Sequence, residues 1–486
     1  MLNKENILQL NSIGISESTV LEQFELLKKN DSFITISGAA TPENGITKVD
    51  DIEKYVEIYD SESRNFHISK FVPASGAATR MFKRLIAFYQ ESNTENLHDG
   101  DFYSVKTTFE KNSEFAFFNE LKSLSSDNDN MTSIANLILF DGLGYANLPK
   151  GLIDFHKYSD HSRTAFEEHI HEAIAMIDKS NPLDIHLTIS REFFEKFNKK
   201  LMEIQKKEQL NINVSFSFQE PSTNTIAIYH DGSLVKEQDG KLLLRPGGHG
   251  ALLQNLNKID SDIVFIKNID NVVHESFLSL TIKYKKLIGG ILIEAIGKIS
   301  HYYSELNKPN PSPAIIEEAI LYLGTTFGAR FNENSNICEQ LLKYLNRPIR
   351  VCGMVKNTGE PGGGPFWVID SDGNESLQIV EKAQLDLSKP DQKEHFNNST
   401  HFNPVDLVCY LKDPEGQKFD LNNFVDKEAC FISEKTHFGK HIRVLEHPGL
   451  WNGAMSNWLT IFVEVPLVTF NPVKELNDLL RKEHQG

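Results

Sequence analysis

The stretch Ile68-Ser-Lys-Phe-Val72, followed by Pro73-Ala-Ser-Gly-Ala-Ala-Thr-Arg80, decides how the rest of the chain is interpreted. Its first five residues form a short apolar run that is typical of a buried strand. The next eight residues are mostly small and end in an arginine, and apolar residues then recur at helical spacing over 81–89. The stretch therefore predicts a strand, a tight loop of small residues and a helix.

Strands and helices continue to alternate further along the chain. Residues 184–189, 213–218 and 262–267 have the length and the apolar or alternating pattern of strands. A helical pattern follows the first of these stretches and begins at a cap residue, Ser190. Strands that alternate with helices predict an α/β fold in which helices cover both faces of a mixed, mostly parallel sheet.

The two ends of the chain have different patterns. We expect residues 1–65 to be mostly helical, with Ser16 or Ser18 as the cap of one helix. Residues 275–345 also have a helical pattern. From Arg350 onward the chain becomes richer in strand-like segments, which are residues 350–356, 365–370, 377–381 and 459–465.

These patterns predict three parts. The first is a helical N-terminal extension over residues 1–66, and the second is a core over 67–390 with insertions near 90–145 and 275–345. The third is a C-terminal part over 391–486 that is rich in strands. No internal repeat divides the chain further.

The composition of the 486-residue chain restricts the classes of protein it can belong to. Apolar residues make up 40% and charged residues 24%, which is close to the average of globular proteins and excludes a disordered or low-complexity chain. The formal net charge of −17 argues against nonspecific binding of nucleic acid or of an anionic membrane. A small basic pocket for phosphates remains compatible with this charge.

Several features predict a cytoplasmic protein. The four cysteines form no CxxC pair, and we expect them to be reduced thiols. The first twelve residues lack the apolar core of a signal peptide. The most apolar stretch, residues 287–293, is much shorter than the roughly 20 residues that a membrane helix needs. We therefore expect no membrane partner.

The loop of small residues after the first strand is a candidate anion-binding site. Small side chains at Ser75, Gly76, Ala77, Ala78 and Thr79 allow backbone N–H groups to converge on phosphate oxygens at the start of a helix. The guanidinium of Arg80 can add a forked, charged contact to the same phosphate. The alternative is a tight strand–helix turn that ends in a solvated arginine.

A second glycine-rich stretch, Pro246-Gly-Gly-His-Gly250, is a candidate site for a flat ligand. The backbone at Gly247, Gly248 and Gly250 lacks side chains that would block close approach of a base, and His249 lies among them. A glycine-rich hairpin turn explains the same residues without a ligand.

Three single charged residues are candidates for phosphate chemistry. Asp270 follows a hydrophobic strand, and the carboxyl ends of strands carry the ligand crevice in open α/β sheets, where an aspartate can hold magnesium against phosphates. Its alternative role is an Asx turn that ends the strand. Lys150, between Pro149 and Gly151, and Lys474, at an expected helix start, can supply compact positive charges or can be solvated lysines.

The stretch Asp370-Ser-Asp372 resembles the DxD metal motif of glycosyltransferases. It also begins a window of calcium-loop length, but Gly373 does not fall at the position that a calcium loop requires. Strand-like segments lie on both sides of it. We therefore interpret this stretch as the turn of a β-hairpin.

The order of these motifs along the chain is that of one superfamily. The chain resembles the nucleotide-sugar pyrophosphorylases, which are nucleotidyltransferases with a GT-A-like, Rossmann-like core. It is most similar to their UDP-sugar pyrophosphorylase branch, and within it to a bacterial family of unassigned function. The stretches that resemble motifs of this superfamily are Ser75–Arg80 (Gly-x-Gly-Thr-Arg), Pro149–Gly151 (Pro-Lys-Gly), Pro246–Gly250 (Pro-x-Gly-His-Gly), Asn268–Asn271 (the metal-binding strand end), Val380-Glu381 with Gln384, Phe402-Asn403 and Phe470-x-Pro-Val-Lys474.

The resemblance implies transfer of a nucleotidyl group from a nucleoside triphosphate to a sugar 1-phosphate, with release of pyrophosphate. In this role Arg80 and the backbone of residues 75–79 would bind the pyrophosphate, and Lys150 the α-phosphate or the leaving group. Lys474, in the C-terminal part that would complete the sugar-phosphate site, would clamp the sugar phosphate. The resemblance further implies that residues 247–250 seat the base, that Glu381 and Asn403 contact the sugar, and that Asp270 binds magnesium.

The sequence departs from the pattern of this superfamily at three places. Ala78 replaces the second glycine of the first motif, Lys150 lies 70 positions after Arg80, and Asp406 replaces the second asparagine of Phe-Asn-x-Asn. Two other functions therefore stay open: a noncatalytic nucleotide-sugar-binding protein and a GT-A glycosyltransferase. The base is expected to be uracil, with guanine as the alternative, and the sugar is not specified.

Overall fold

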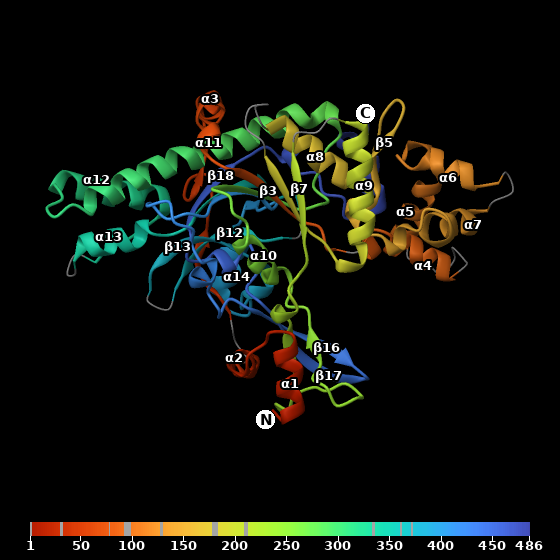
Figure 1. Cartoon of the computed structure of the whole chain (residues 1–486), viewed down its shortest axis with the longest axis horizontal. Coiled ribbons are helices and arrows are strands. Elements are labelled where there is room, and N and C mark those ends of the chain that lie inside the picture. Colours follow the sequence, from red (N-terminus) through yellow and green to blue (C-terminus); the bar gives the residue numbers. More distant parts are fainter. Residues whose placement is uncertain are drawn as a thin grey trace. The chain divides into compact units, whose positions relative to one another are not determined.

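The computed structural model describes residues 2–29, 33–76, 78–91, 99–126, 130–176, 183–208, 212–332, 336–359, 362–370 and 373–486. The chain divides into two compact units, each assembled from three segments (Figure 1). Unit 1 consists of Met1–His67, Gln219–Phe265 and Ile288–Val465. Unit 2 consists of Ile68–Phe218, Ile266–Leu287 and Pro466–Gly486.

Unit 2 contains the parallel strands that the opening stretch of the sequence predicted. β3 (Ile68–Pro73), β6 (Asp184–Thr188) and β7 (Asn213–Ser217) pair in this order, and both pairs are parallel. Every residue of β3 except the last is buried, including the polar Ser69 and Lys70, as expected for a strand inside a parallel sheet.

Two helices of unit 2 pack against these strands. Figure 1 shows α8 (Ala165–Met176) and α9 (Phe194–Lys207) beside β7. Aromatic rings join both helices to this strand, since Phe166 and Phe197 both lie about 6 Å from the ring of Phe216. Ser190 occupies the expected N-cap position, before the 3-10 turn η8 (Arg191–Phe193) that leads into α9, but its hydroxyl makes no cap bond and donates to the Ser75 carbonyl instead.

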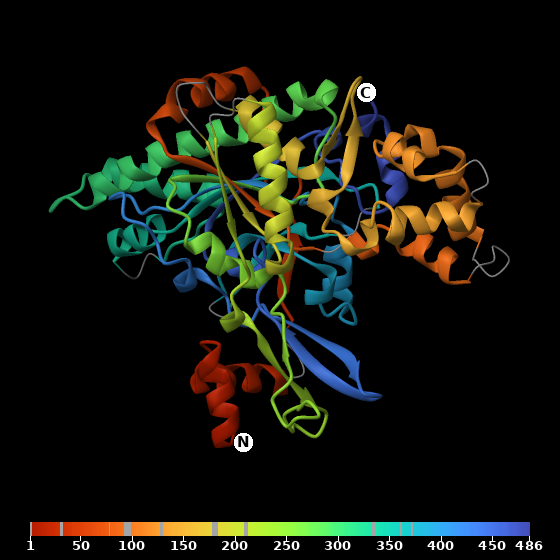
Figure 2. The same ribbon diagram turned by 45° about the vertical axis from the view of Figure 1, so that its right-hand side comes forward.

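The segment that the sequence predicted as an insertion near 90–145 is largely helical in its described parts. It contains α5 (Asp99–Glu110), α6 (Phe118–Leu124) and α7 (Met131–Asn136), which form a group with α4 (Lys83–Glu91), shown in orange in Figure 2. A hairpin of β4 (Asp154–Lys157) and β5 (Ser162–Thr164) follows and leads into α8.

Unit 1 contains the strands that were expected after residue 350. β11 (Ile349–Lys356) is parallel to β18 (Leu459–Glu464), which in turn is parallel to β2 (Ile46–Thr47). β15 (Asp406–Tyr410) pairs with the other side of β11 and is antiparallel, so the sheet is mixed. β10 (Ile263–Lys267) carries the chain from unit 1 into unit 2.

A three-stranded antiparallel sheet of unit 1 contains the stretch that resembles DxD. β12 (Gly364–Ile369) and β13 (Glu375–Val380) form a hairpin, and the Asp370 N–H donates to the Asn374 carbonyl across its turn. The interpretation as a hairpin turn is confirmed, although Ser371 and Asp372 themselves lie outside the described residues.

The outer strand of this sheet is β1 (Thr35–Ala39), which pairs with β12. On its other side, the side chain of Gln392 in α14 (Pro390–Asn397) bonds both backbone groups of Ile36: it accepts from the N–H and donates to the carbonyl, each at 2.9 Å. The expectation of a mostly helical N-terminal segment is therefore incomplete, because β1 and β2 also belong to it.

The expected N-terminal helices are present as α1 (Lys4–Ser12), α2 (Glu17–Lys28) and α3 (Ile52–Glu62). Ser16 caps α2 by accepting a hydrogen bond from the Thr19 N–H, as the sequence predicted. Apolar residues of α1 and α2 share a core with two strands of another antiparallel sheet, β8 (Thr225–Tyr229) and β17 (Lys440–Glu446). The order of that sheet is β16 (Phe431–His437), β17, β8 and β9 (Leu244–Arg245).

The helical pattern over residues 275–345 is confirmed by α11 (Glu275–Leu306), α12 (Pro313–Phe327) and α13 (Ile337–Leu345). At Gly290 of α11 a side chain would collide with the backbone carbonyl of Tyr55, so glycine allows α3 and α11 to pack closely. Across the described parts of the chain, no helix combines the length and apolar character that crossing a membrane requires. All four cysteines are free.

Candidate functional site

The ends of two strands in unit 2 are joined by backbone hydrogen bonds. The Ile269 N–H, just after β10, donates to the Pro73 carbonyl at the end of β3. Beyond β3, the N–H of Ala78 donates to the Leu148 carbonyl. These two bonds bring the loop of small residues, the Pro149–Gly151 turn and the end of β10 to the same edge of the sheet, as the sequence predicted for strand ends.

The C-terminal segment of unit 2 adds the fourth motif to this edge. The Val473 N–H donates to the Asp270 carbonyl at 3.0 Å, and the Leu476 N–H donates to the Met81 carbonyl at 3.1 Å. Lys474 lies between these two bonds in the sequence. Four motifs that are spread over 400 residues are therefore held together by backbone contacts.

The charged centre of this edge is Asp270 with two lysines. Lys150 Nζ lies 2.8 Å from Asp270 Oδ2 and donates a second hydrogen bond, 2.6 Å long, to the Val473 carbonyl. Lys474 Nζ lies 3.3 Å from the same Oδ2. The side chains of Asp270 and Lys150 are 9% and 13% exposed, whereas that of Lys474 is 50% exposed. Lys474 is therefore the partner that can most easily exchange Asp270 for a ligand.

Asp270 remains ionised in this setting. Burial alone would raise the pKa of its carboxyl, but the charges of Lys150 and Lys474 and their hydrogen bonds outweigh burial, and the pKa falls below its ordinary value. One carboxylate with two ammonium groups leaves a positive charge at the strand ends. Such a site attracts phosphate groups.

The loop of small residues is only partly arranged for binding an anion. Gly76, Thr79 and Arg80 are exposed, and Arg80 ends the short 3-10 helix η2 (Ala78–Arg80). The N–H of Ala78 already donates to Leu148, so it is not available to a phosphate in this conformation. Ala77 lies outside the described residues.

Asp270 is also the candidate ligand for magnesium. Where the chain is described, no group of three or more His, Cys, Asp or Glu side chains could hold a metal ion. Magnesium that acts on phosphates usually takes one or two protein carboxylates and obtains its other ligands from water and substrate. A single ionised carboxylate at a phosphate-attracting edge fits that manner of binding.

In unit 1, the glycines of the 246–250 loop are required by contacts within the chain. A side chain at Gly247 would collide with the ring of His447, and one at Gly250 would collide with the Pro448 carbonyl. Gly248 has a φ of 73°, which also favours glycine. The close approach that the sequence predicted is therefore made, at least in part, by the chain's own segment after β17.

The imidazole of His249 is held in one orientation. It stacks on Trp451 with ring centroids 4.3 Å apart, and its Nδ1 accepts a hydrogen bond from the Leu450 N–H. Burial lowers the pKa of His249 to about 4, so the ring is neutral at pH 7 and carries its proton on Nε2. Nε2 lies 4.0 Å from Glu381 Oε1.

Glu381 is the second half-exposed polar group of this part of unit 1. The Asn452 amide donates to Gln384 Oε1 at 3.2 Å and to Glu381 Oε1 at 3.5 Å. Burial raises the pKa of the Glu381 carboxyl, and the bond from Asn452 acts in the opposite direction. The structure thus brings together Glu381, Gln384 and His249, which belong to two separate motifs.

Asn403 is buried and has a role within its own turn. Its Oδ1 accepts from the Val405 N–H at 2.9 Å, and its Nδ2 donates to the Gly353 carbonyl at 3.3 Å. Val405 has a φ of 57°, which is unfavourable for a β-branched residue. The side chain of Asn403 therefore stabilises a strained turn.

Trp451 and Asn452 contact predicted site residues but were not predicted themselves. Both lie in the turn-rich stretch Pro448-Gly-Leu-Trp-Asn-Gly453. An aromatic residue among glycines was the available signal, because such stretches often line binding sites on loops.

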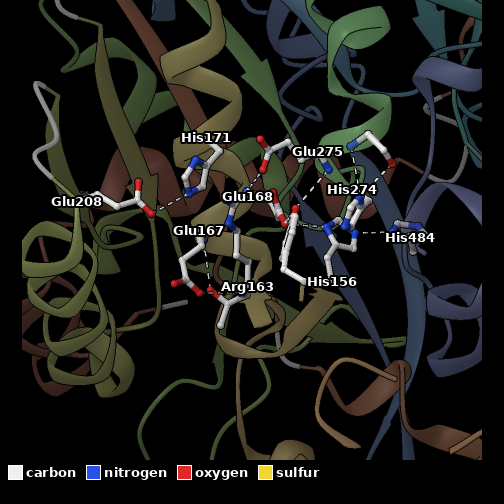
Figure 3. A network of polar contacts seen from close by, with 12 residues as sticks. His156, Arg163, Glu167, Glu168, His171, Glu208, His274, Glu275 and His484 are labelled. Carbon is white, nitrogen blue, oxygen red and sulfur yellow. Dashed lines mark hydrogen bonds and ion pairs between the residues drawn. The ribbon is translucent and has the colours of Figure 1, made fainter. Parts of the chain in front are cut away.

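Unit 2 contains a second polar network, which the sequence did not indicate (Figure 3). His156 is completely buried between Glu168 Oε1, 2.9 Å from its Nδ1, and His484 Nδ1, 2.8 Å from its Nε2. The Tyr158 hydroxyl also donates to Glu168 Oε1. Burial raises the pKa of Glu168 to about 7. The network ties the β4–β5 hairpin, α8 and the C-terminal segment together.

Comparison with solved structures identifies the fold. The chain is similar to the uridine diphosphate N-acetylglucosamine pyrophosphorylase of Trypanosoma brucei, with 12% identity, a TM-score of 0.50 and coverage of 99% of this chain and 79% of that one. It is also similar to the UDP-glucose pyrophosphorylase of Leishmania major, with 13% identity, a TM-score of 0.46 and coverage of 99% and 79%. The expected mixed α/β fold of a pyrophosphorylase is confirmed.

The sequence itself identifies the family. The model of the family described as Domain of unknown function (DUF4301) matches residues 3–485, and the chain belongs to this family. No curated protein sequence matches the chain.

Proposed function

We propose that the protein is a nucleotidyltransferase that joins a nucleoside triphosphate to a sugar 1-phosphate and releases pyrophosphate. The observation that carries this proposal is the convergence of Lys150, Asp270 and Lys474 at the strand ends of unit 2. Phosphoryl chemistry needs positive charges that are held in place before the reaction, and this centre provides two of them beside one carboxylate.

The proposed reaction needs no general base. A phosphate oxygen of the sugar 1-phosphate forms a bond to the α-phosphorus, and the bond from that phosphorus to the bridging oxygen of the pyrophosphate breaks. The pyrophosphate leaves with the electron pair, and no proton has to move. The protein has to align two anions and reduce their repulsion.

The charged residues of unit 2 divide this task. In the proposal, Lys150 binds the α-phosphate or the leaving group, since its ammonium is fixed by Asp270 and the Val473 carbonyl. Lys474 is half exposed and clamps the sugar phosphate. Arg80 is exposed at the end of the small-residue loop and neutralises the pyrophosphate.

Asp270 would hold magnesium, and when bound the ion would neutralise charge on the phosphates. Before substrate binds, Asp270 keeps both lysine ammonium groups at the strand ends. Its lowered pKa means that it performs this function as a carboxylate at neutral pH.

Unit 1 supplies recognition of the nucleotide and sugar in this proposal. The 247–250 loop seats the base, expected to be uracil, and Glu381 and Asn403 contribute to the sugar site. The neutral Nε2–H of His249 and the carboxylate of Glu381 face each other across 4.0 Å. We further infer that the protein acts in the cytoplasm, in accord with its free thiols.

The test is magnesium-dependent release of pyrophosphate from four nucleoside triphosphates, each combined with common sugar 1-phosphates. Release with one pair, abolished by Asp270→Asn, would support the proposal and identify both substrates. A Glu195→Gln variant, with a similar change at an exposed position of α9, serves as the control.

Failure of this test has two distinct forms. Silence across the panel, with a nucleotide still raising the melting temperature, would contradict catalysis and favour a nucleotide-binding protein. The lack of catalysis would then be traced first to the N–H of Ala78, which already donates to the Leu148 carbonyl and is not available to a phosphate. Silence without any thermal shift would mean that only the fold is shared.

A further inference from the structure

A second charged group lies deeper in unit 2. Glu172 of α8 receives Lys70 of β3, with Nζ 2.8 Å from Oε1, and Lys267 of β10, with Nζ 2.6 Å from Oε2. The side chains of all three residues are at most 2% exposed. Lys285 of α11 also approaches, with its Nζ 3.6 Å from Glu172 Oε1.

This arrangement is costly for a protein interior. Three buried lysines surround the single carboxylate of Glu172, whereas a buried charge normally needs a full partner. Apolar residues of similar volume at such positions are often neutral or stabilising. Fold stability alone therefore gives a weak reason for these lysines.

The buried group is connected to the strand ends that form the candidate site. Lys267 is the last residue of β10, and Asp270 lies three residues later in the turn that follows this strand. The ring of His169 bonds the Ile269 carbonyl through Nε2 at 3.2 Å, and the His169 carbonyl accepts from Lys70 at 3.0 Å.

We propose that Lys267 and the protonated form of Lys70 are positioning residues that supply a positive potential beneath the strand ends and so strengthen binding of a polyphosphate there. The inference rests on the proposed function, because it assumes a phosphate chain at Asp270, Lys150 and Lys474. In the interior, little water screens these charges, so they act over a distance at which surface charges would be screened.

The charge of the ligand separates this role from a structural one. A lysine that only supports the fold would, when replaced, weaken all ligands of the site to a similar extent. If the lysine acts through its electric field, its replacement weakens the binding of each ligand in proportion to the charge of that ligand. Lys70→Met removes the charge and keeps most of the side-chain volume, and because Glu172 keeps Lys267 as its partner we expect the variant to fold.

The experiment is isothermal titration of the wild-type protein, Lys70→Met and Lys206→Met with uridine, UMP and UTP at pH 6, which lies below the lowered pKa of Lys70, so that its ammonium is charged. Lys206 is an exposed lysine of α9 and controls for the change in net charge. We expect Lys70→Met to bind UTP about tenfold more weakly, UMP less affected, and uridine within twofold of wild type. If the panel above selects another base, the corresponding series of that base is used.

Two results would overturn the inference while leaving the proposed function intact: equal weakening of uridine, UMP and UTP, or unchanged UTP binding in a folded Lys70→Met protein. Failure of the wild-type protein to bind any triphosphate would instead refute the proposed function, and this inference with it. Should Lys70→Met not fold, Lys267→Met provides the same charge-graded comparison, with the same outcomes.

Discussion

Unit 2 places lysines around a single carboxylate at two depths, two lysines at the strand ends and three in the interior. Asp270 with Lys150 and Lys474 lies at the strand ends, and Lys474 is half exposed. Glu172 with Lys70 and Lys267 is sealed inside. The upper group can exchange an ion pair for a ligand phosphate, whereas the lower group can influence the ligand only through its field. In the proposed function, the exposure of each group therefore decides whether it contacts the ligand or only acts on it from a distance, although both groups consist of a carboxylate and lysines.

The largest effect is expected at the carboxylate of the upper group. Asp270→Asn removes the charge that holds both lysines and the proposed magnesium ligand, so pyrophosphate release should fall by about 100-fold or more. The measurement is the initial rate at saturating substrates. Activity within a few-fold of wild type would refute the metal role of Asp270. The carboxylate at the strand ends would then have no more direct part in the reaction than the buried carboxylate of Glu172.

The two lysines of the upper group are expected to differ. Lys474→Met should lower the rate about tenfold and raise KM for the sugar phosphate, with little change in melting temperature, because Lys474 is half exposed. Lys150→Met should also destabilise the fold, since Asp270 and the Val473 carbonyl lose a nearly buried partner. Rates and melting curves of both variants decide this, and identical behaviour of the two would contradict it.

The lower group predicts a dependence of stability on pH. Burial lowers the pKa of Lys70 to about 7, from 10.5, so between these values the unfolded chain binds a proton that the folded protein does not. The free energy of unfolding should therefore rise with pH above 7, and this contribution is absent in Lys70→Met. Urea unfolding of both proteins at pH 7 and pH 9 should show a difference that changes by about 2 kcal/mol. Parallel pH profiles would contradict the prediction.

The smallest effect on turnover is expected at a third carboxylate, which has no lysine partner. Glu168, in the network of Figure 3, has its pKa raised to about 7 by burial, so the folded protein binds a proton between about pH 4.5 and 7 that the unfolded chain has lost. Stability should fall as pH rises through this range, by about 3 kcal/mol, and Glu168→Gln should flatten the profile. Its turnover should stay within twofold of wild type, since a large loss would connect this network to the site.

Local patterns in the sequence were sufficient for most of the strands and helices. β3, β6 and β10 are short apolar runs with clear ends, and the motifs that follow β3 and β10 meet because parallel strands end at one edge. The grouping of Lys150, Asp270 and Lys474 was accordingly foreseen as a set of phosphate-binding charges. Their direct ion pairs were not foreseen, since these depend on side-chain geometry.

The remaining features depend on contacts between distant residues. Lys70 and Lys267 each interrupt an apolar strand, and only the tertiary arrangement shows that Glu172 lies between them. The stacking of His249 on Trp451 joins residues about 200 positions apart. Ser190 is a residue type that often caps helices, but its hydroxyl donates to the Ser75 carbonyl and makes no cap bond, because that carbonyl lies within its reach in the folded chain.

The bond between Gln392 and Ile36 has a consequence for the behaviour of the protein in concentrated solution. An outer strand such as β1 offers unpaired N–H and carbonyl groups to strands of other molecules, which is a common route to aggregation. The Gln392 amide bonds both backbone groups of Ile36, the second residue of that strand, and does so without adding another strand. The side chain of Gln392 thus hinders intermolecular β-pairing at this edge.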